Sequence, residues 1–218
     1  MTNKEFASLA AQLLPHLPDM VVKVPLMICS PVREMVRGLC FERSGSDKRR
    51  FYLWVFFMPL CVPSRHVTFD LGRRLGGLEQ RWNTDEPHLT EKLLFSIRAE
   101  GLPFLNNLQA PNNAAHFALS VARTNKSAHA QQTGAYMLAR SGKVQEAVSS
   151  LDELLQLLVG DTSWQAEMAS RAQMLKSLLL SDPPLAKKQL LAWEAETLEN
   201  LGLEKFGERK QGAIHIIQ

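Results

Sequence analysis

The segment formed by residues 70–77 combines residue types that are suited to binding an anion. It reads DLGRRLGG, so that two adjacent arginines stand between glycines. Glycines let the backbone approach a ligand closely, and guanidinium groups pair with phosphate or carboxylate through two parallel hydrogen bonds. Arg73 and Arg74 are therefore candidate anion-binding residues. The spacing matches neither the phosphate-binding loop nor the dinucleotide-binding fingerprint, and the alternative is a turn whose arginines are solvated or paired with Glu79.

Residues just before this segment have the types needed for a catalytic triad. Ser64, His66 and Asp70 are a hydroxyl, an imidazole and a carboxylate within seven positions. However, Ser64 lacks the GxSxG context of a nucleophile elbow. On a strand, His66 and Asp70 would share a face but lie ~13 Å apart, beyond hydrogen-bond reach. We reject this triad and predict no catalytic residue, keeping an enzyme with an unrecognised site near Asp70 and Arg74 as one alternative.

Basic residues concentrate in the first part of the chain. Residues 1–82 hold 12 Lys+Arg and 7 Asp+Glu, while the rest of the chain holds 13 and 15. Lys48, Arg49 and Arg50 stand at the tip of an expected hairpin that is rich in aromatic residues. Sheets that bind single-stranded nucleic acid combine basic edges with exposed aromatic rings. Nucleic-acid binding through this hairpin and Arg73/Arg74 is the second alternative, although a net charge of only +3 fits poorly with strong phosphate binding.

The cysteines and histidines do not form a recognisable metal or redox motif. None of the six histidines has a partner at a helical metal-ligand spacing, and the three cysteines form no CxxC pair. We therefore expect no metal, no cofactor and no disulfide, with Cys29, Cys40 and Cys61 acting as small apolar residues. No stretch approaches the ~18 apolar residues needed to cross a bilayer. The sequence thus predicts a soluble, cytoplasmic protein with no membrane partner.

Residues 1–82 predict a small antiparallel sheet of three or four strands, preceded by one helix at residues 3–14. We expect a strand at residues 21–29, one or two helical turns after Ser30-Pro31, and a second strand of alternating pattern at residues 66–71. The strongest hairpin signal joins residues 39–43 to residues 50–60 through a polar turn. The second arm, FYLWVFFMPL, is almost continuously apolar, which favours burial on both faces.

Residues 83–218 show helical periodicity almost throughout, and they predict an all-helical half that packs against the sheet. We expect six helices, of which the first ends before Gly101; they cover residues 89–99, 112–123, 128–140, 143–159, 162–180 and 185–201. Residues 213–217 could be a strand or a tail. The chain is therefore expected to be an α+β protein with two subdomains, residues 1–82 and 83–218, in one compact unit.

Residues 135–158 contain the most regular pattern of the chain. Small residues occupy the first helix, Gly142 marks a turn, and an apolar stripe ending in leucines follows. This segment resembles one helix pair of the tetratricopeptide family, in which stacked pairs form a concave peptide-binding surface. No second copy follows at the 34-residue interval of the family, and the turn at residues 181–184 is not of the family's type. The alternative is an ordinary antiparallel helical bundle.

The leading hypothesis for function is a non-catalytic adaptor that holds a protein or peptide partner in a groove of the helical half. It follows from the resemblance and from the lack of a recognisable catalytic motif. The candidate partner-binding residues are Tyr136, Arg140, Gln145 and Glu146. The sequence does not predict an oligomeric state.

Overall fold

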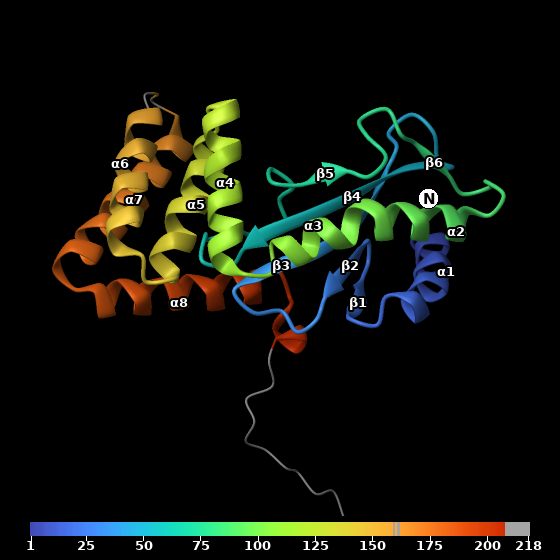
Figure 1. Cartoon of the computed structure of the whole chain (residues 1–218), viewed down its shortest axis with the longest axis horizontal. Coiled ribbons are helices and arrows are strands. Elements are labelled where there is room, and N and C mark those ends of the chain that lie inside the picture. Colours follow the sequence, from blue (N-terminus) through green and yellow to red (C-terminus); the bar gives the residue numbers. More distant parts are fainter. Residues whose placement is uncertain (159, 161, 208–218) are drawn as a thin grey trace, which may run out of the picture.

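The computed structural model describes residues 1–158, 160 and 162–207. It confirms the α+β fold class, with an antiparallel sheet in the N-terminal half and helices in the C-terminal half. Figure 1 shows the sheet and its covering helices at one end of an elongated molecule, and a stack of helices at the other. Strand β4 ends against this stack, so the two parts meet along one boundary.

Within the described residues, six strands form one sheet in which all neighbouring strands are antiparallel. The predicted hairpin is confirmed, because β3 and β4 pair along their whole shared length, from Met35 opposite Pro59 to Arg43 opposite Phe51. The other edge of β4 pairs with two short strands, β5 near Trp54 and β6 near Phe51. The strands are β1 (Met20–Lys23), β2 (Leu26–Cys29), β3 (Met35–Arg43), β4 (Arg50–Pro59), β5 (Arg73–Arg74) and β6 (Trp82–Asn83).

Three expectations for the sheet are corrected. Residues 21–29 form two strands instead of one, because the chain reverses between β1 and β2 at the cis Val24-Pro25 bond. The residues expected to make helical turns after Pro31 instead begin β3, whose backbone groups pair with those of β4. Residues 66–71 form no strand, since β5 and β6 already occupy the free edge of β4. In each case the pairing of strands within the sheet decides the conformation, and the preference of the local sequence does not.

One face of the sheet is covered by one helix that precedes the strands in sequence and by two helices that follow them. Helix α1 (Asn3–Leu13) begins with a capping box between Thr2 and Glu5 and places Phe6 edge-on against Phe41 of β3. Helices α2 (Leu89–Ser96) and α3 (Leu102–Asn107) are joined by a π-helical turn, Ile97–Gly101. Buried residues of these elements pack against the sheet, so α2 and α3 belong to its core.

The expectation that a helix ends before Gly101 is wrong, because the chain stays helical into α3. A Cβ atom at Gly101 would lie 3.2 Å from Cδ1 of Leu75 and 3.7 Å from Cδ2 of Leu39. Gly101 therefore serves close packing of the helix on the sheet and is not a helix terminator.

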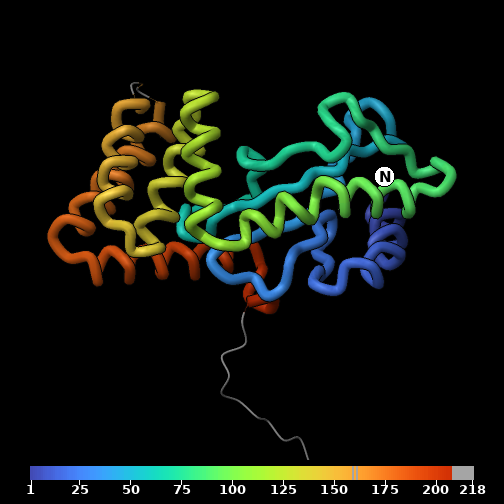
Figure 2. The backbone as a smooth tube through the Cα atoms, viewed as in Figure 1, coloured from blue at the N-terminus to red at the C-terminus, as the bar shows by residue number. Residues whose placement is uncertain are grey.

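The other face of the sheet is covered by the segment that follows the last helix. Leu201 and Leu203 pack against Ile28 and Phe56, and the short 3₁₀ helix Glu204–Phe206 lies beside the start of β3. The Val32 amide donates to the Phe206 carbonyl at 2.8 Å. The smooth trace in Figure 2 shows this return of the chain beneath the strands. The predicted burial of β4 on both faces is confirmed except at Tyr52 and Trp54, which are half-buried; residues 213–217 lie outside the described residues.

The helical stack begins after α3, and its helices agree with the expected ranges to within about two residues at each end. They are α4 (Pro111–Asn125), α5 (Ala128–Arg140), α6 (Val144–Leu157), α7 (Ser163–Ser181) and α8 (Pro183–Asn200). Figure 1 shows α4 to α7 side by side, with α8 crossing beneath them toward the sheet. Gly134 allows α5 to approach α4 closely, because a Cβ atom there would lie 2.5 Å from the Leu119 side chain. Within the described residues, no helix is both long and apolar enough to cross a bilayer.

A group of three charged side chains joins the stack to the sheet. Arg140, at the end of α5, donates from Nε to Glu194 of α8 at 2.5 Å, and its other arm lies 3.5 Å from Glu34, which precedes β3. The side chains of Arg140 and Glu194 are only 17% and 13% exposed. Burial raises the pKa of the Glu194 carboxyl, and the Arg140 guanidinium opposes that rise. Arg140 therefore offsets the cost of burying a carboxylate at the boundary.

We expect the Arg140→Ala variant to lose about 2–3 kcal/mol of unfolding free energy, because Glu194 is left buried without its cation. Without Arg140 the pKa of Glu194 rises further in the folded state, so the folded state binds a proton more readily than the unfolded state. The loss should therefore be larger at about pH 8 than at about pH 5. Urea denaturation at both pH values measures this. Lys143→Ala, which breaks the exposed pair with Glu146, is the control and should cost less than about 0.5 kcal/mol.

We expect Gly38→Ala to destabilise the sheet by about 2–3 kcal/mol through overpacking. A Cβ atom at Gly38 would lie 2.2 Å from the Met27 carbonyl oxygen, a backbone atom that pairing in β2 holds in place. Thermal and urea denaturation give the measurement. Gly45→Ala is the matched control, because a Cβ atom there has nothing within 4 Å. Equal stability of the two variants would contradict the close approach of β2 and β3.

Candidate functional site

A cleft of about 220 Å³ lies where the sheet meets the helical stack. Helices α5 and α7 form one side, and the chain from the end of β4 to Asp70 forms the other. Residues 60–70 reach this position because β4 ends against the stack, and the chain then turns across the face of the sheet. The lining residues are Met58, Pro59, Val62, Pro63, Ser64, Thr68, Asp70, His129, Gln132, Thr133, Trp164, Glu167, Met168 and Arg171.

The rim of the cleft carries two stacked rings. His129, in the first turn of α5, and Trp164, in the first turn of α7, have ring centroids 5.2 Å apart and planes inclined by 19°. Each helix begins just before its ring, and the Ser127 hydroxyl caps α5 by accepting from the Ala130 amide. Trp164 is 45% exposed, an unusual exposure for the largest apolar side chain. The rim therefore offers a flat aromatic surface with solvent on one side.

The floor of the cleft is apolar, with a few buried polar groups. Met58 and Met168 are buried, and methionine side chains adapt their shape to what they contact. Gln132 and Thr133 are also buried and face the same space. Beside Gln132, the Tyr136 hydroxyl is buried and has no hydrogen-bond partner of normal geometry among the described residues. Burial raises the pKa of that hydroxyl to about 12, with Gln132 opposing the rise, so Tyr136 is uncharged and does not act as a base.

The charges at the cleft are few and partly neutralise each other. Arg171 forms an ion pair with Glu167 one turn earlier on α7, while Asp70 is exposed at the opposite side. Small-molecule and cofactor sites usually measure ~300–1,000 Å³, so a space of about 220 Å³ is better matched to one side chain. Among the described residues, no group of three histidine, cysteine or acidic side chains could hold a metal ion.

The structure separates the four residues predicted to bind a partner. Tyr136 is fully buried and stacks on Trp193 of α8, with ring centroids 5.5 Å apart, so it cannot contact a partner directly. Arg140 is occupied by Glu194 and Glu34. Gln145 and Glu146 are exposed, and they line a shallow hollow of about 420 Å³ between α4, α5 and α6.

Neither Trp164 nor His129 is among the site residues predicted from the sequence. The sequence carries no signal for Trp164, because it stands four residues before Met168 and therefore in line with the apolar stripe formed by Met168, Ala172, Leu175 and Leu179. Its proximity to His129 could not be inferred, because 34 residues and a whole helix separate the two.

The two arginines of the predicted anion site contact different aromatic rings. Arg73 and Arg74 are neighbours on the short strand β5, and successive side chains of a strand point to opposite faces. The Arg73 guanidinium lies 5.6 Å from the Phe104 ring of α3. The Arg74 guanidinium lies 3.7 Å from the Tyr52 ring and also 3.7 Å from Glu42. The structure does not bring the two guanidinium groups together, and Arg74 pairs with Glu42 instead of the Glu79 considered as the alternative.

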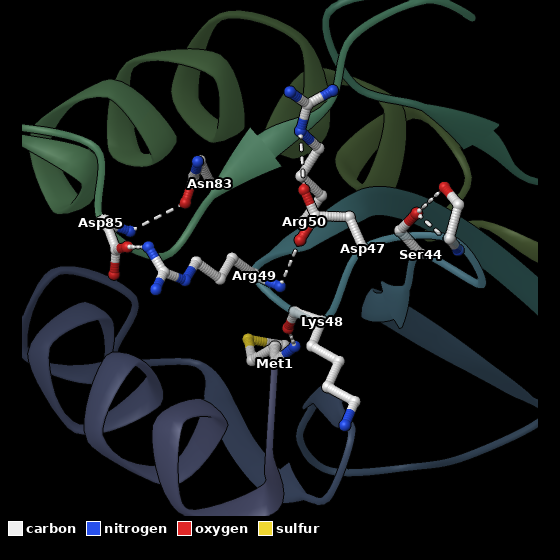
Figure 3. Close-up of polar contacts among 9 residues, drawn as sticks. Met1, Ser44, Asp47, Lys48, Arg49, Arg50, Asn83 and Asp85 are labelled. Atoms are coloured by element: carbon white, nitrogen blue, oxygen red, sulfur yellow. Dashed lines mark hydrogen bonds and ion pairs between the residues drawn. The ribbon is translucent and has the colours of Figure 1, made fainter.

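The basic hairpin tip is largely neutralised by acidic neighbours. Figure 3 shows Arg49 reaching Asp85, at 2.7 Å, and Arg50 beside Asp47, at 3.2 Å. The Lys48 carbonyl accepts from the amino group of Met1, which fixes the tip to the start of α1. Two of the three basic side chains are thus already paired within the chain.

The cysteines are placed as expected. Cys40 and Cys61 are buried, Cys29 is half-buried, and all three are free thiols. Burial raises the pKa of each thiol, to about 12 for Cys40. Because the reactive form of cysteine is the thiolate, these side chains are poor nucleophiles.

Comparisons with protein-family models, with curated proteins and with solved structures give no match. The tetratricopeptide resemblance of residues 135–158 therefore remains a prediction from the sequence. Function has to be argued from the geometry of the chain itself.

The position of Arg74 against the aromatic rings predicts a structural role. We expect Arg74→Ala to lower the unfolding free energy by about 1–2 kcal/mol, because it removes both a partly desolvated cation–π contact and an ion pair. Arg49→Ala removes an exposed ion pair and should cost less than about 0.5 kcal/mol. Urea denaturation of the two variants, side by side, measures the difference. A loss for Arg49→Ala as large as that for Arg74→Ala would contradict this assignment.

Proposed function

We propose that this protein is a non-catalytic binding module that holds a segment of another polypeptide, and that the cleft between α5, α7 and residues 58–70 receives one apolar side chain of that segment. The observation that supports the proposal most strongly is the part-exposed stack of His129 and Trp164 over a space of about one side chain. Tryptophan is among the residue types that most often dominate the energy of a protein interface.

The floor and walls support a peptide as the ligand. Met58 and Met168 offer apolar contact that can adjust to different side chains, and Gln132 and Thr133 offer polar groups to a peptide backbone. The residues proposed to contact the peptide therefore differ from the partner-binding residues expected from the sequence. They involve the inner sides of α5 and α7, and Gln145 and Glu146 on α6 take no part.

The two alternatives receive less support. For nucleic acid, Arg49 and Arg50 are ion-paired, and Arg74 already covers the Tyr52 ring that a base would need. For an enzyme near residues 70–74, only Asp70 lines the cleft, and it is exposed. A catalytic carboxylate would need a base or nucleophile aligned with it, and the lining residues provide no such arrangement.

The test is a selection of random peptides displayed on phage against the whole protein, followed by titration calorimetry with the enriched peptides. We expect enriched peptides to share one large apolar residue. Their affinity should fall at least about tenfold in the Trp164→Ala variant, because the aromatic rim is removed. Circular dichroism and thermal denaturation establish that the variant is folded.

The matched control is Leu191→Ala on α8, a side chain exposed to a similar degree, 42% against 45%, that does not line the cleft. This variant should bind the enriched peptides like the unaltered protein. A selection that enriches no peptide would overturn the proposal. So would enriched peptides that bind Trp164→Ala and the unaltered protein equally well.

A further inference from the structure

A second apolar hollow lies at the other end of the molecule. It has a volume of about 650 Å³ and is formed by α2, the π-helical turn that follows it and the 3₁₀ turn after α1, with His16, Glu91, Leu94, Phe95, Arg98 and Ala99 as its lining. Phe95 is 74% exposed, although Leu93 and Leu94 just before it in α2 are buried. Figure 1 shows α2 lying over the sheet at the end opposite α6 and α7, away from the proposed peptide cleft.

The charged residues of this surface stand on both sides of Phe95 along the helix. Glu91 precedes it by four residues and Arg98 follows it by three, so all three lie on one side of the helix and line the same hollow. Glu91 and Arg98 are about 10 Å apart along the helix, too far to pair with each other. Neither forms an ion pair or hydrogen bond with any other described residue, and both are exposed.

We propose that this surface binds the same surface of a second copy of the chain, with the two α2 helices antiparallel across a twofold axis near Phe95. Antiparallel docking places Glu91 of each copy opposite Arg98 of the other, so that two ion pairs form at the ends of the contact. Between them, each Phe95 enters the apolar hollow beside Leu94 and Ala99 of the opposite copy. A protrusion and a hollow on one face, flanked by an acid four residues before Phe95 and a base three residues after it, suit an isologous interface.

The charge arrangement favours a second copy over an unrelated partner. A partner of another sequence would need its own matched acid and base at this spacing, whereas a copy of this chain supplies them by symmetry. The contact is small, one helix face for each copy, and a weak, concentration-dependent dimer is therefore expected. The inference does not depend on the peptide cleft, which this interface leaves free.

The experiment is sedimentation equilibrium of the full chain over a wide concentration range. We expect a monomer–dimer equilibrium for the unaltered protein. Phe95→Ala should weaken dimerisation by about thirtyfold or more, because it removes the central apolar contact twice in each dimer. Glu91→Arg and Arg98→Glu should each weaken it by about tenfold, because each replaces two attractions with two repulsions.

The decisive measurement is a mixture of the two charge variants. In a mixed dimer of Glu91→Arg with Arg98→Glu, every pair across the interface is again of opposite sign, so the mixture should associate more strongly than either variant alone. Leu78→Ala is the control, because Leu78 is 78% exposed and lies outside the hollow; it should dimerise like the unaltered protein. A monomer at all concentrations would overturn the proposal, as would a dimer that the charge variants do not change.

Discussion

The contact of Arg140 with Glu194 and Glu34 fixes how the two parts of the molecule sit against each other. It joins the end of α5, the middle of α8 and the segment that leads into β3, and two of its members are nearly buried. A buried carboxylate is stable only when its cation is held in place, so the group tolerates little movement of α8 relative to the sheet. The proposed peptide cleft lies along the same boundary, and its width therefore depends on this contact.

The aromatic stack and the buried polar groups of the cleft are consequences of the same arrangement. Tyr136 of α5 stacks on Trp193 of α8. This ring contact sets the distance between the two helices. Helix α5 also presents Gln132 and His129 to the cleft, one and two turns before Tyr136. The surface that is proposed to bind a peptide is thus built on rigid helices, a condition for precise recognition.

The sequence predicts the elements of this fold far better than their contacts. Periodicity locates α4 to α8 closely, and the β3–β4 hairpin follows from its turn and apolar arms. The residues after Pro31 and residues 66–71 were misassigned because strand formation depends on which neighbour is free to pair, and this is a property of the whole sheet. Arg140 and Tyr136 were expected at the surface, since a helical pattern does not reveal which polar residues face another element. Trp164 and His129 meet only through the tertiary fold.

The return of the chain beneath the sheet links the two ends of the described sequence. Leu203 and Phe206 cover apolar residues that were synthesised about 170 positions earlier, among them Val32 and Ile28. Phe69 packs on the same side of the sheet against Phe56, so the last segment completes a cover that the middle of the chain begins. Contacts between residues so distant in sequence form late and slowly in folding. A partly folded chain in which this last segment is not yet docked consequently leaves apolar residues of the sheet open to solvent and to association with other chains.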